Sequence, residues 1–230
     1  MKNKKSKDNA GKAAAELVKT GMKVGLGTGS TAAYFITHLI ERCQQGLKIQ
    51  AVATSQQSWD QAAAGGIPML DINLDINKVT TLDLTVDGAD EIDAQKRMIK
   101  GGGGALLREK IIASISKEMI VIIDESKEVK HLGKCALPVE IIPFAHHATI
   151  AQLKKLGYKG KLRKTTKNQP FITDNNNYIY DIELHHPCSN PEDDDHKIRN
   201  VPGVVTTGFF FNLAGRVIVG FDDGHIEIRP

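Results

Sequence analysis

The sequence predicts an α/β fold, in which a mostly parallel sheet with helices on both faces is joined to a smaller α+β domain. Two observations lead to this prediction. Strand-like and helix-like segments alternate through the first half of the chain, and that alternation is typical of parallel sheets whose crossover helices cover both faces. Beyond about residue 135 the order changes, and strand-like segments there come in pairs as well as singly.

The first half contains the segments that should build the larger sheet. Short apolar or alternating runs predict strands, and longer runs with a helical period predict helices. Strands are predicted at 22–25, 48–53, 82–86 and 119–123, and helices at 10–18, 30–45, 56–64 and around Glu109. Parallel sheets place ligands at the carboxyl ends of their strands. The residues that follow these strands are therefore the first candidates for a functional site.

The second half predicts a small domain of a different kind. Strands are predicted at 139–142, 161–164, 171–173, 178–183 and 204–207, and helices at 145–156 and 191–199. The segment Asp174–Asn177 is a strong turn signal between two of these strands. The order βα-ββ-αβ is that of a ferredoxin-like split βαβ unit.

A predicted hairpin follows the small domain. Segments 217–220 and 225–228 flank the turn signal Asp222-Asp223-Gly224, and they should rejoin the first sheet. We therefore expect a larger domain made of residues 1–134 and 208–230, and a smaller α+β domain made of residues 135–207.

Composition argues against several classes of function. The net charge is +3, and the four lysines at positions 2, 4, 5 and 7 exceed it, so we expect no basic face for nucleic acid. The longest apolar run, Met119–Ile123, is far too short to span a membrane, and no apolar segment follows the basic start as a signal peptide requires. Cys43, Cys135 and Cys188 form no CxxC pair. This argues against a structural zinc site and indicates a reducing, cytoplasmic location.

The segment Gly25-Leu-Gly-Thr-Gly-Ser-Thr31 joins a predicted strand to a predicted helix. Free backbone N–H groups at a helix N-terminus bind anions, and the hydroxyls of Thr28, Ser30 and Thr31 add donors. The segment satisfies G-x-G-x-x-A, but no acidic residue follows the second strand to hold a ribose, and no Gly-Lys-Ser/Thr makes it a P-loop. A single phosphate therefore fits better than a dinucleotide. The alternative is an ordinary helix cap by Ser30 or Thr31.

The segment Val86-Asp-Gly-Ala-Asp-Glu-Ile92 follows the alternating strand. Asp87 and Asp90 should lie at its carboxyl end, where carboxylates can hold sugar hydroxyls or move their protons. The structural alternatives are an Asx-turn at Asp87 and acids at a helix N-terminus. A hard-cation site is a further alternative, but the spacing of a calcium loop is absent, and we expect no metal.

Lys100 is followed by four glycines, Gly101 to Gly104, and then by a helix. Consecutive glycines cost backbone entropy when they become ordered, so they indicate close approach of the backbone to a ligand. On a helical wheel Glu109 falls about 200° from Leu107, between two apolar groups. Partial burial there should raise the pKa of its carboxylate toward that of a proton-transfer base. The alternative is a surface glutamate on a helix that begins after glycines.

A third strand end carries Lys127. The segment Asp124-Glu-Ser-Lys127 follows the apolar run 119–123. Lys127 would supply a second positive charge near the phosphate, and the alternative is an ordinary solvated lysine.

These segments together resemble ribose-5-phosphate isomerases of the A type. The motifs that carry the resemblance lie at 27–31, 86–91, 100–103, 108–110, 124–127, 137–143 and 202–205. They occur in order over nearly the whole chain. The resemblance implies a Rossmann-like domain with a small α+β domain, usually in a homodimer or higher oligomer. It also implies a cofactor-free interconversion of ribose 5-phosphate and ribulose 5-phosphate through an enediolate.

The resemblance also assigns roles by position. Glu109 matches the base that transfers the proton, and Asp87, Asp90 and Lys100 match polar residues that contact the sugar. The chemistry of the implied reaction makes Lys100 and the glycine N–H groups candidate donors to the enediolate oxygen, and Asp87 the candidate for ring opening. The implied substrate-binding residues are Lys7, Thr28, Gly29, Ser30, Thr31, Asp87, Gly88, Ala89, Asp90, Lys100, Gly101, Gly102, Gly103 and Lys127.

The sequence departs from the family pattern in two places. Gly104 and Leu107 stand where the family commonly has an alanine and a threonine, and the segment 185–195 is poorly matched. Two other classes of function stay open. One is a non-catalytic sensor of sugar phosphates, and the other is an acyl-CoA transferase of related fold that uses a glutamate nucleophile.

Overall fold

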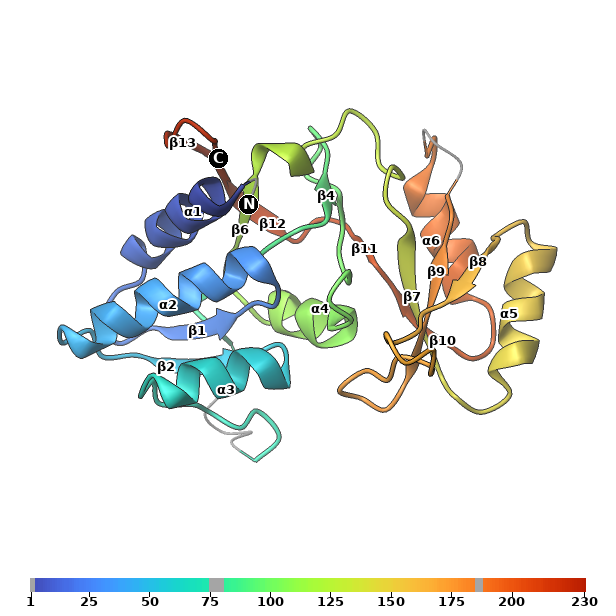
Figure 1. The fold of residues 1–230 in the computed structure, drawn as a ribbon, viewed down its shortest axis with the longest axis horizontal. Coiled ribbons are helices and arrows are strands. Elements are labelled where there is room, and N and C mark those ends of the chain that lie inside the picture. Colours follow the sequence, from blue (N-terminus) through green and yellow to red (C-terminus); the bar gives the residue numbers. More distant parts are fainter. Residues whose placement is uncertain (1–2, 75–80, 185–187) are drawn as a thin grey trace. The chain divides into compact units, whose positions relative to one another are not determined.

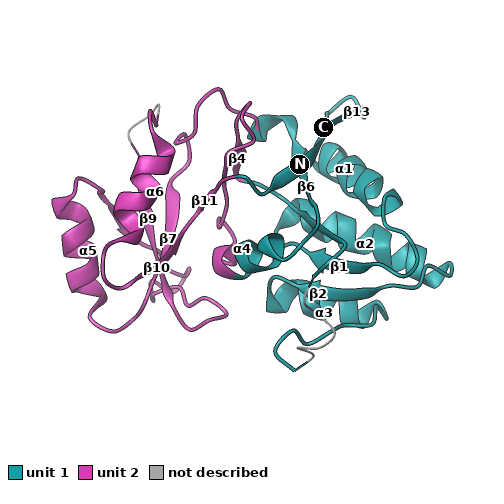
Figure 2. Cartoon of the chain, turned by 180° about the vertical axis from the view of Figure 1, so that it is seen from behind, with its two compact units in different colours: residues 1–89, 108–127, 212–230 teal, residues 90–107, 128–211 magenta. Residues whose placement is uncertain are grey.

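The computed structural model describes residues 3–74, 81–184 and 188–230 and divides into two compact units (Figure 2). The first unit consists of Met1–Ala89, Arg108–Lys127 and Asn212–Pro230, and the second of Asp90–Leu107 and Glu128–Phe211. The expected domain boundaries lay at 135 and 208. In the structure the second unit also takes in residues 90–107 and 128–134, and the first unit resumes at Asn212.

A six-stranded sheet forms the centre of the first unit (Figure 1). Its strand order is β13-β12-β6-β3-β1-β2. The bounds are β1 Lys23–Leu26, β2 Gln50–Ala53, β3 Leu84–Asp87, β6 Met119–Asp124, β12 Ala214–Gly220 and β13 Ile226–Arg229. All neighbouring pairs are parallel except β12 with β13. The mostly parallel sheet and the return of the late hairpin to it are therefore confirmed.

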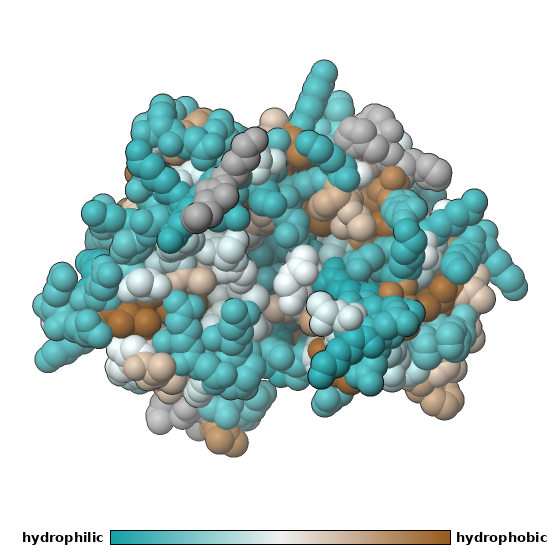
Figure 3. Space-filling view, in the orientation of Figure 1, coloured by the Kyte–Doolittle hydropathy of each residue, from teal (hydrophilic) through white to brown (hydrophobic). Residues whose placement is uncertain are grey.

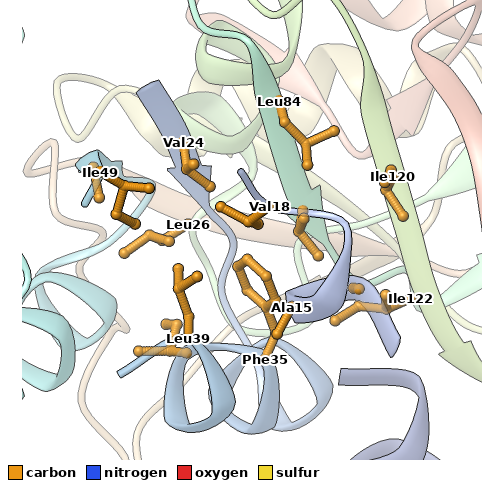
Figure 4. Packing of buried hydrophobic residues seen from close by; sticks show 14 of the residues in the cluster. Ala15, Val18, Val24, Leu26, Phe35, Leu39, Ile49, Leu84, Ile120 and Ile122 are labelled. Carbon is orange, nitrogen blue, oxygen red and sulfur yellow. The ribbon is translucent and has the colours of Figure 1, made fainter. Parts of the chain in front are cut away.

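Helices cover both faces of this sheet, as predicted. They are α1 (Lys4–Glu16), α2 (Ser30–Gln44), α3 (Gln56–Ala64) and α4 (Leu106–Ser114). Phe35 and Leu39 of α2 pack with Val24 and Leu26 of β1 in a cluster that also holds residues of α1 and α3 (Figure 4). Ile112 of α4 packs in a separate cluster with residues on the opposite face. Apolar side chains that alternate along the strands thus divide the helices between the two faces.

Helix ends follow local sequence signals. α3 begins after Ser55, whose side chain accepts a hydrogen bond from Ser58 N, and this is the usual N-cap interaction. In the second unit, α6 (Pro191–Arg199) begins after Asn190, which accepts from Asp193 N in the same way. Both helices begin and end where the sequence predicts.

The second unit contains the expected split βαβ arrangement. Its four-stranded antiparallel sheet has the order β10-β7-β9-β8. The elements in chain order are β7 (Leu137–Ile141), α5 (His146–Lys155), β8 (Gly160–Leu162), β9 (Tyr178–Ile182), α6 and β10 (Val204–Thr207). The strand predicted at 171–173 is wrong. That segment instead forms the arm of a turn, because Thr173 N bonds to Asn177 O and Asn176 N to Thr173 O.

A small third sheet in the second unit was not predicted. It has the order β11-β5-β4, with β4 at Glu91–Ile92, β5 at Met98–Ile99 and β11 at Phe209–Phe210. Each strand has two residues, which is too short for a period to be recognised in the sequence. The short helix η1 (Glu125–Lys127) follows β6 in the first unit. The poorly matched residues 185–187 lie outside the described residues.

The surface seen in Figure 3 is mainly hydrophilic, with small and separate apolar patches. Scattered apolar residues of this kind are normal on globular proteins. Among the helices in the described ranges, none is long and apolar enough to cross a membrane.

Candidate active site

Two strand ends meet where the order of the first sheet reverses. β1 lies between β2 and β3, so the chain moves to one side of β1 after the first crossover and to the other side after the next. Ligands of open α/β sheets bind at such switch points, beyond the carboxyl ends of the strands. Here the two ends carry Gly27 and Asp87.

The loop after β1 approaches β3 closely. Gly27 N bonds to Val86 O at 2.9 Å, and a Cβ on Gly27 would lie 2.6 Å from Asp87 Cα, so only glycine fits. Gly29 has φ 111° and forms the N-cap of α2 without any side-chain cap. The expected alternative, a cap by Ser30 or Thr31, is therefore not what the structure has. The first turn of α2 keeps its N–H groups available to an anion.

Lys7 of α1 reaches this loop. Its Nζ donates to Ser30 Oγ at 3.0 Å, and Ser30 is exposed. Asp124 at the end of β6 is 1% exposed, and its Oδ2 lies 3.9 Å from Lys7 Nζ. Asp124 Oδ1 also accepts from Asn3 Nδ2 at 2.7 Å. The buried carboxylate thus anchors the start of α1 and places one cation beside the N-terminus of α2.

Asp87 is fully buried at the end of β3. Its Oδ1 accepts from Thr28 N at 3.0 Å and from Gly88 N at 2.7 Å. The hydroxyls of Thr28 and Thr54 lie 2.7 Å apart. Alternation along β3 puts Asp87 on the same face as Thr85, which is the face that α4 covers, because Ile112 of α4 approaches Gly25.

Glu109 lies in the first turn of α4 and is 4% exposed. The sequence predicts this burial. The buried residues of the helix and its lead-in are Ala105, Leu106, Glu109, Ile112 and Ala113, and these span one face with Glu109 near its centre. Ile111, on the other side, is 48% exposed. Burial of a carboxylate costs free energy. A glutamate at the centre of a buried face therefore indicates a role beyond that of an ordinary surface side chain.

Five predicted residues, Asp90, Lys100, Gly101, Gly102 and Gly103, lie in the second unit. Lys100 directly follows β5 and is 2% exposed, and its Nζ lies 5.5 Å from the centre of the Phe210 ring. Gly102 N donates to Asp90 Oδ2 at 2.7 Å. Gly101 and Gly104 have φ 101° and 86°, and Gly102 and Gly103 are exposed. The glycines thus form a tight turn with an accessible tip.

The structure explains one departure from the family pattern. A Cβ on Gly104 would lie 2.5 Å from Phe171 Cε1, and its φ is left-handed. Alanine at this position would be strained and would displace the Phe171 ring.

The remaining predicted residues are Gly88 and Ala89, which are half-buried directly after Asp87, and Lys127, which is half-buried at the end of η1. Thr54 and Asp124 are not among the predicted site residues, but both contact residues that are. Thr54 lies beside Thr28, and Asp124 holds Lys7. Both contacts join residues that are distant in the chain, so no local pattern indicates them.

Carboxylate oxygens of the acidic segment 87–93 accept hydrogen bonds from N–H groups. Asp93 accepts from Arg97 Nε at 2.7 Å and from Arg97 N at 3.0 Å, and Glu91 accepts from Gly133 N at 2.9 Å and from Cys135 N. Carboxylates held in this way are poor ligands for a hard cation. Within residues 3–74, 81–184 and 188–230, no three His, Cys, Asp or Glu side chains are grouped to hold a metal ion.

Comparison with known proteins gives consistent matches. Residues 50–224 match the family model of ribose 5-phosphate isomerase A (phosphoriboisomerase A). The chain is 51% identical to the ribose-5-phosphate isomerase A of Protochlamydia amoebophila over 97% of this chain and 95% of that protein. It is 46% identical to that of Bacillus mycoides over 95% and 96%.

Solved structures agree. The ribose 5-phosphate isomerase A of Methanocaldococcus jannaschii matches with a TM-score of 0.90 and 36% identity, over 99% of each chain. A D-ribose-5-phosphate isomerase in complex with phospho-erythronic acid matches with a TM-score of 0.91 and 38% identity, over 100% of this chain and 99% of that one. The predicted α/β fold class is thereby confirmed.

Proposed function

The chain belongs to the ribose 5-phosphate isomerase A family, and we propose that it interconverts D-ribose 5-phosphate and D-ribulose 5-phosphate with Glu109 as the proton-transfer base. The observation that carries the proposal is the place of Glu109, a buried carboxylate in the first turn of a helix that begins two residues after the last of four glycines. Incubation of the protein with ribose 5-phosphate, followed by detection of the ketose, tests the activity itself.

The reaction needs one proton to move between neighbouring carbons. In the open-chain aldose, a base removes the proton from C2, and the electrons form an enediolate with the carbonyl at C1. A proton moves from O2 to O1, and return of a proton to C1 then gives the ketose. One carboxylate placed above both carbons can perform both steps, and such acid–base catalysis contributes about 10²–10⁴-fold.

The enediolate oxygens need donors that are already in place. We assign this role to the Lys100 ammonium and to those backbone N–H groups of the glycine loop, Gly101–Gly104, that do not already donate to Asp90 or to Gly101 O, because preorganised donors stabilise charge as it develops. Asp87, whose carboxylate lies at the switch point, moves a hydroxyl proton during ring opening. Asp90 holds a sugar hydroxyl. A relative binds phospho-erythronic acid, whose carboxylate resembles the charge and shape of an enediolate.

The phosphate is assigned to residues 27–31 with Lys7 and Lys127. Uncapped N–H groups of α2 and the Lys7 ammonium beside Ser30 support this assignment, because helix N-termini and cations both attract anions.

Ser30→Ala or Thr31→Ala should raise the KM for ribose 5-phosphate. Each variant removes one hydroxyl donor, and a hydrogen bond to a charged group contributes about 1.5–3 kcal/mol, or roughly 10- to 100-fold. Steady-state kinetics will measure the change. Dephosphorylated ribose serves as the control substrate. Equal losses for ribose and ribose 5-phosphate would show that the loop does not recognise the phosphate.

Activity should survive EDTA, since the proposed mechanism uses a carboxylate, an ammonium and backbone donors. We expect the same kcat before and after exhaustive chelation. A loss that Mg²⁺ or Mn²⁺ restores would contradict this and would revive the cation site at the acidic segment.

The two other classes of function make different predictions. An acyl-CoA transferase would form a covalent glutamyl thioester, which hydroxylamine traps. A sensor would bind ribose 5-phosphate without turnover. Detection of the ketose together with the absence of a hydroxylamine adduct at Glu109 would exclude both.

We also propose that the enzyme is a cytoplasmic homodimer in the non-oxidative pentose phosphate pathway. Three free cysteines support a reducing compartment, and the family resemblance supports the oligomer. Light scattering coupled to size exclusion tests the dimer, and a monomer at micromolar concentration would contradict it.

A further inference from the structure

Arg163 contacts the backbone of the glycine loop and is not among the residues assigned above. It follows β8 in the second unit, and its side chain is 16% exposed. Its Nη1 donates to two backbone carbonyls of the loop, Gly101 O at 2.9 Å and Gly102 O at 3.0 Å.

A second set of contacts fixes the guanidinium itself. Nε and Nη2 donate to the two carboxylate oxygens of Asp181 at 2.9 and 2.5 Å, which is the bidentate geometry that only arginine provides. The Phe171 ring lies 5.8 Å from Arg163 Cζ. Asp181 belongs to β9, which pairs with β8, so the guanidinium is held against this pair of strands.

The consequence for the loop follows from peptide geometry. In a trans peptide the carbonyl and the following N–H point in opposite directions. When Arg163 holds the carbonyls of Gly101 and Gly102, the N–H groups of Gly102 and Gly103 must point away from it. Gly102 N does so, because it donates to Asp90 Oδ2 at 2.7 Å.

The loop needs contacts that fix its backbone because its residues are glycines. Four consecutive residues without a Cβ have many accessible backbone conformations, and a rotated peptide would turn a donor into an acceptor at the same place. Near an enediolate, a carbonyl oxygen would repel the charge that an N–H stabilises.

We propose that Arg163, held by Asp181, is a positioning residue that orients the glycine loop and Asp90 for catalysis. The inference rests on the proposed function of the loop. It concerns only the orientation of the loop and of Asp90, since Arg163 is assigned no contact with substrate.

The test compares Arg163→Met and Arg163→Lys with Lys161→Met. Lys161 lies two residues earlier on β8, and its ion pair with Glu183 is exposed, so its loss should change kcat by less than about twofold. Arg163→Met should lower kcat by roughly 10- to 100-fold, as misplaced catalytic groups do. Arg163→Lys should fall between, because one ammonium cannot serve both carbonyls and the carboxylate.

Three further measurements separate positioning from general damage. Inhibition by inorganic phosphate, which probes residues 27–31 in the other unit, should be unchanged in Arg163→Met. Affinity for phospho-erythronic acid should fall together with kcat. The double variant Arg163→Met/Asp181→Asn should be no slower than Arg163→Met alone, because the two residues act as one unit.

A folded Arg163→Met protein with normal kcat would overturn the inference, as would an equal loss of phosphate inhibition. If Arg163→Met does not fold, Arg163→Lys and Asp181→Asn are judged by the same criteria. Lys100→Met distinguishes failure of the function proposed for the loop from failure of the role proposed for Arg163. Normal kcat in that variant would mean that the proposed function of the loop has failed, whereas an impaired Lys100→Met beside a normal Arg163→Met would mean that only the role of Arg163 has failed.

Discussion

Glu109→Gln should lower kcat by at least about 10²–10⁴-fold while leaving substrate binding nearly intact. Glutamine keeps the size of the side chain and can still donate and accept hydrogen bonds, but it cannot remove a proton from carbon. The variant should also fold normally, because a neutral amide is cheaper to bury than a carboxylate. Steady-state kinetics and the affinity for phospho-erythronic acid will separate the effects on chemistry and on binding.

A matched control for this variant is Glu118→Gln. Glu118 belongs to the same unit and forms a partly exposed ion pair with Arg216, with 2.7 Å between Oε1 and Nε, so losing its charge should change kcat by less than about twofold. Near-normal kcat in a folded Glu109→Gln protein would rule out the assignment. Asp87 would then be the leading candidate for the base.

Lys100→Met should lower kcat by about 10²–10³-fold, the usual cost of losing one donor to an oxyanion. Methionine keeps the apolar length of the side chain, which lies against Phe210, and removes the charge from a site that is 2% exposed. The KM should change less than kcat, because the interaction develops in the transition state.

Lys154→Met on the exposed surface of α5 controls for the loss of one positive charge. The affinity of Lys100→Met for phospho-erythronic acid should fall with kcat, whereas the affinity for inorganic phosphate should not. If Lys100→Met instead raised KM with kcat unchanged, Lys100 would bind the ground state and the enediolate donor would lie elsewhere.

The sequence predicts the elements whose signals are local. β1 and α2 have clear periods, and α3 and α6 have polar caps at their starts. The order of elements in the second half then suffices for the split βαβ unit. The third sheet was missed because its strands have two residues each, and it is this sheet that assigns residues 90–107 to the second unit.

The candidate site shows the same division between local and distant information. The glycines around Lys100 and the burial of Glu109 are visible in the spacing of a few residues. The ion pair between Asp124 and Lys7 and the hydrogen bond from Arg163 to Gly101 O join residues more than 60 positions apart in the chain. Such contacts depend on how strands pair, and a single sequence carries no local trace of them.

The central claim is that Glu109 forms the enediolate, and proton exchange with solvent tests it most directly. Wild-type protein incubated with ribose 5-phosphate in D₂O should place deuterium at C2 of the aldose and C1 of the ketose over many turnovers. NMR of the substrate pool will measure this. We expect the incorporation to stop in Glu109→Gln while phospho-erythronic acid still binds. Incorporation by Glu109→Gln at a rate near that of the wild type would contradict the account, because another group would then be removing the proton.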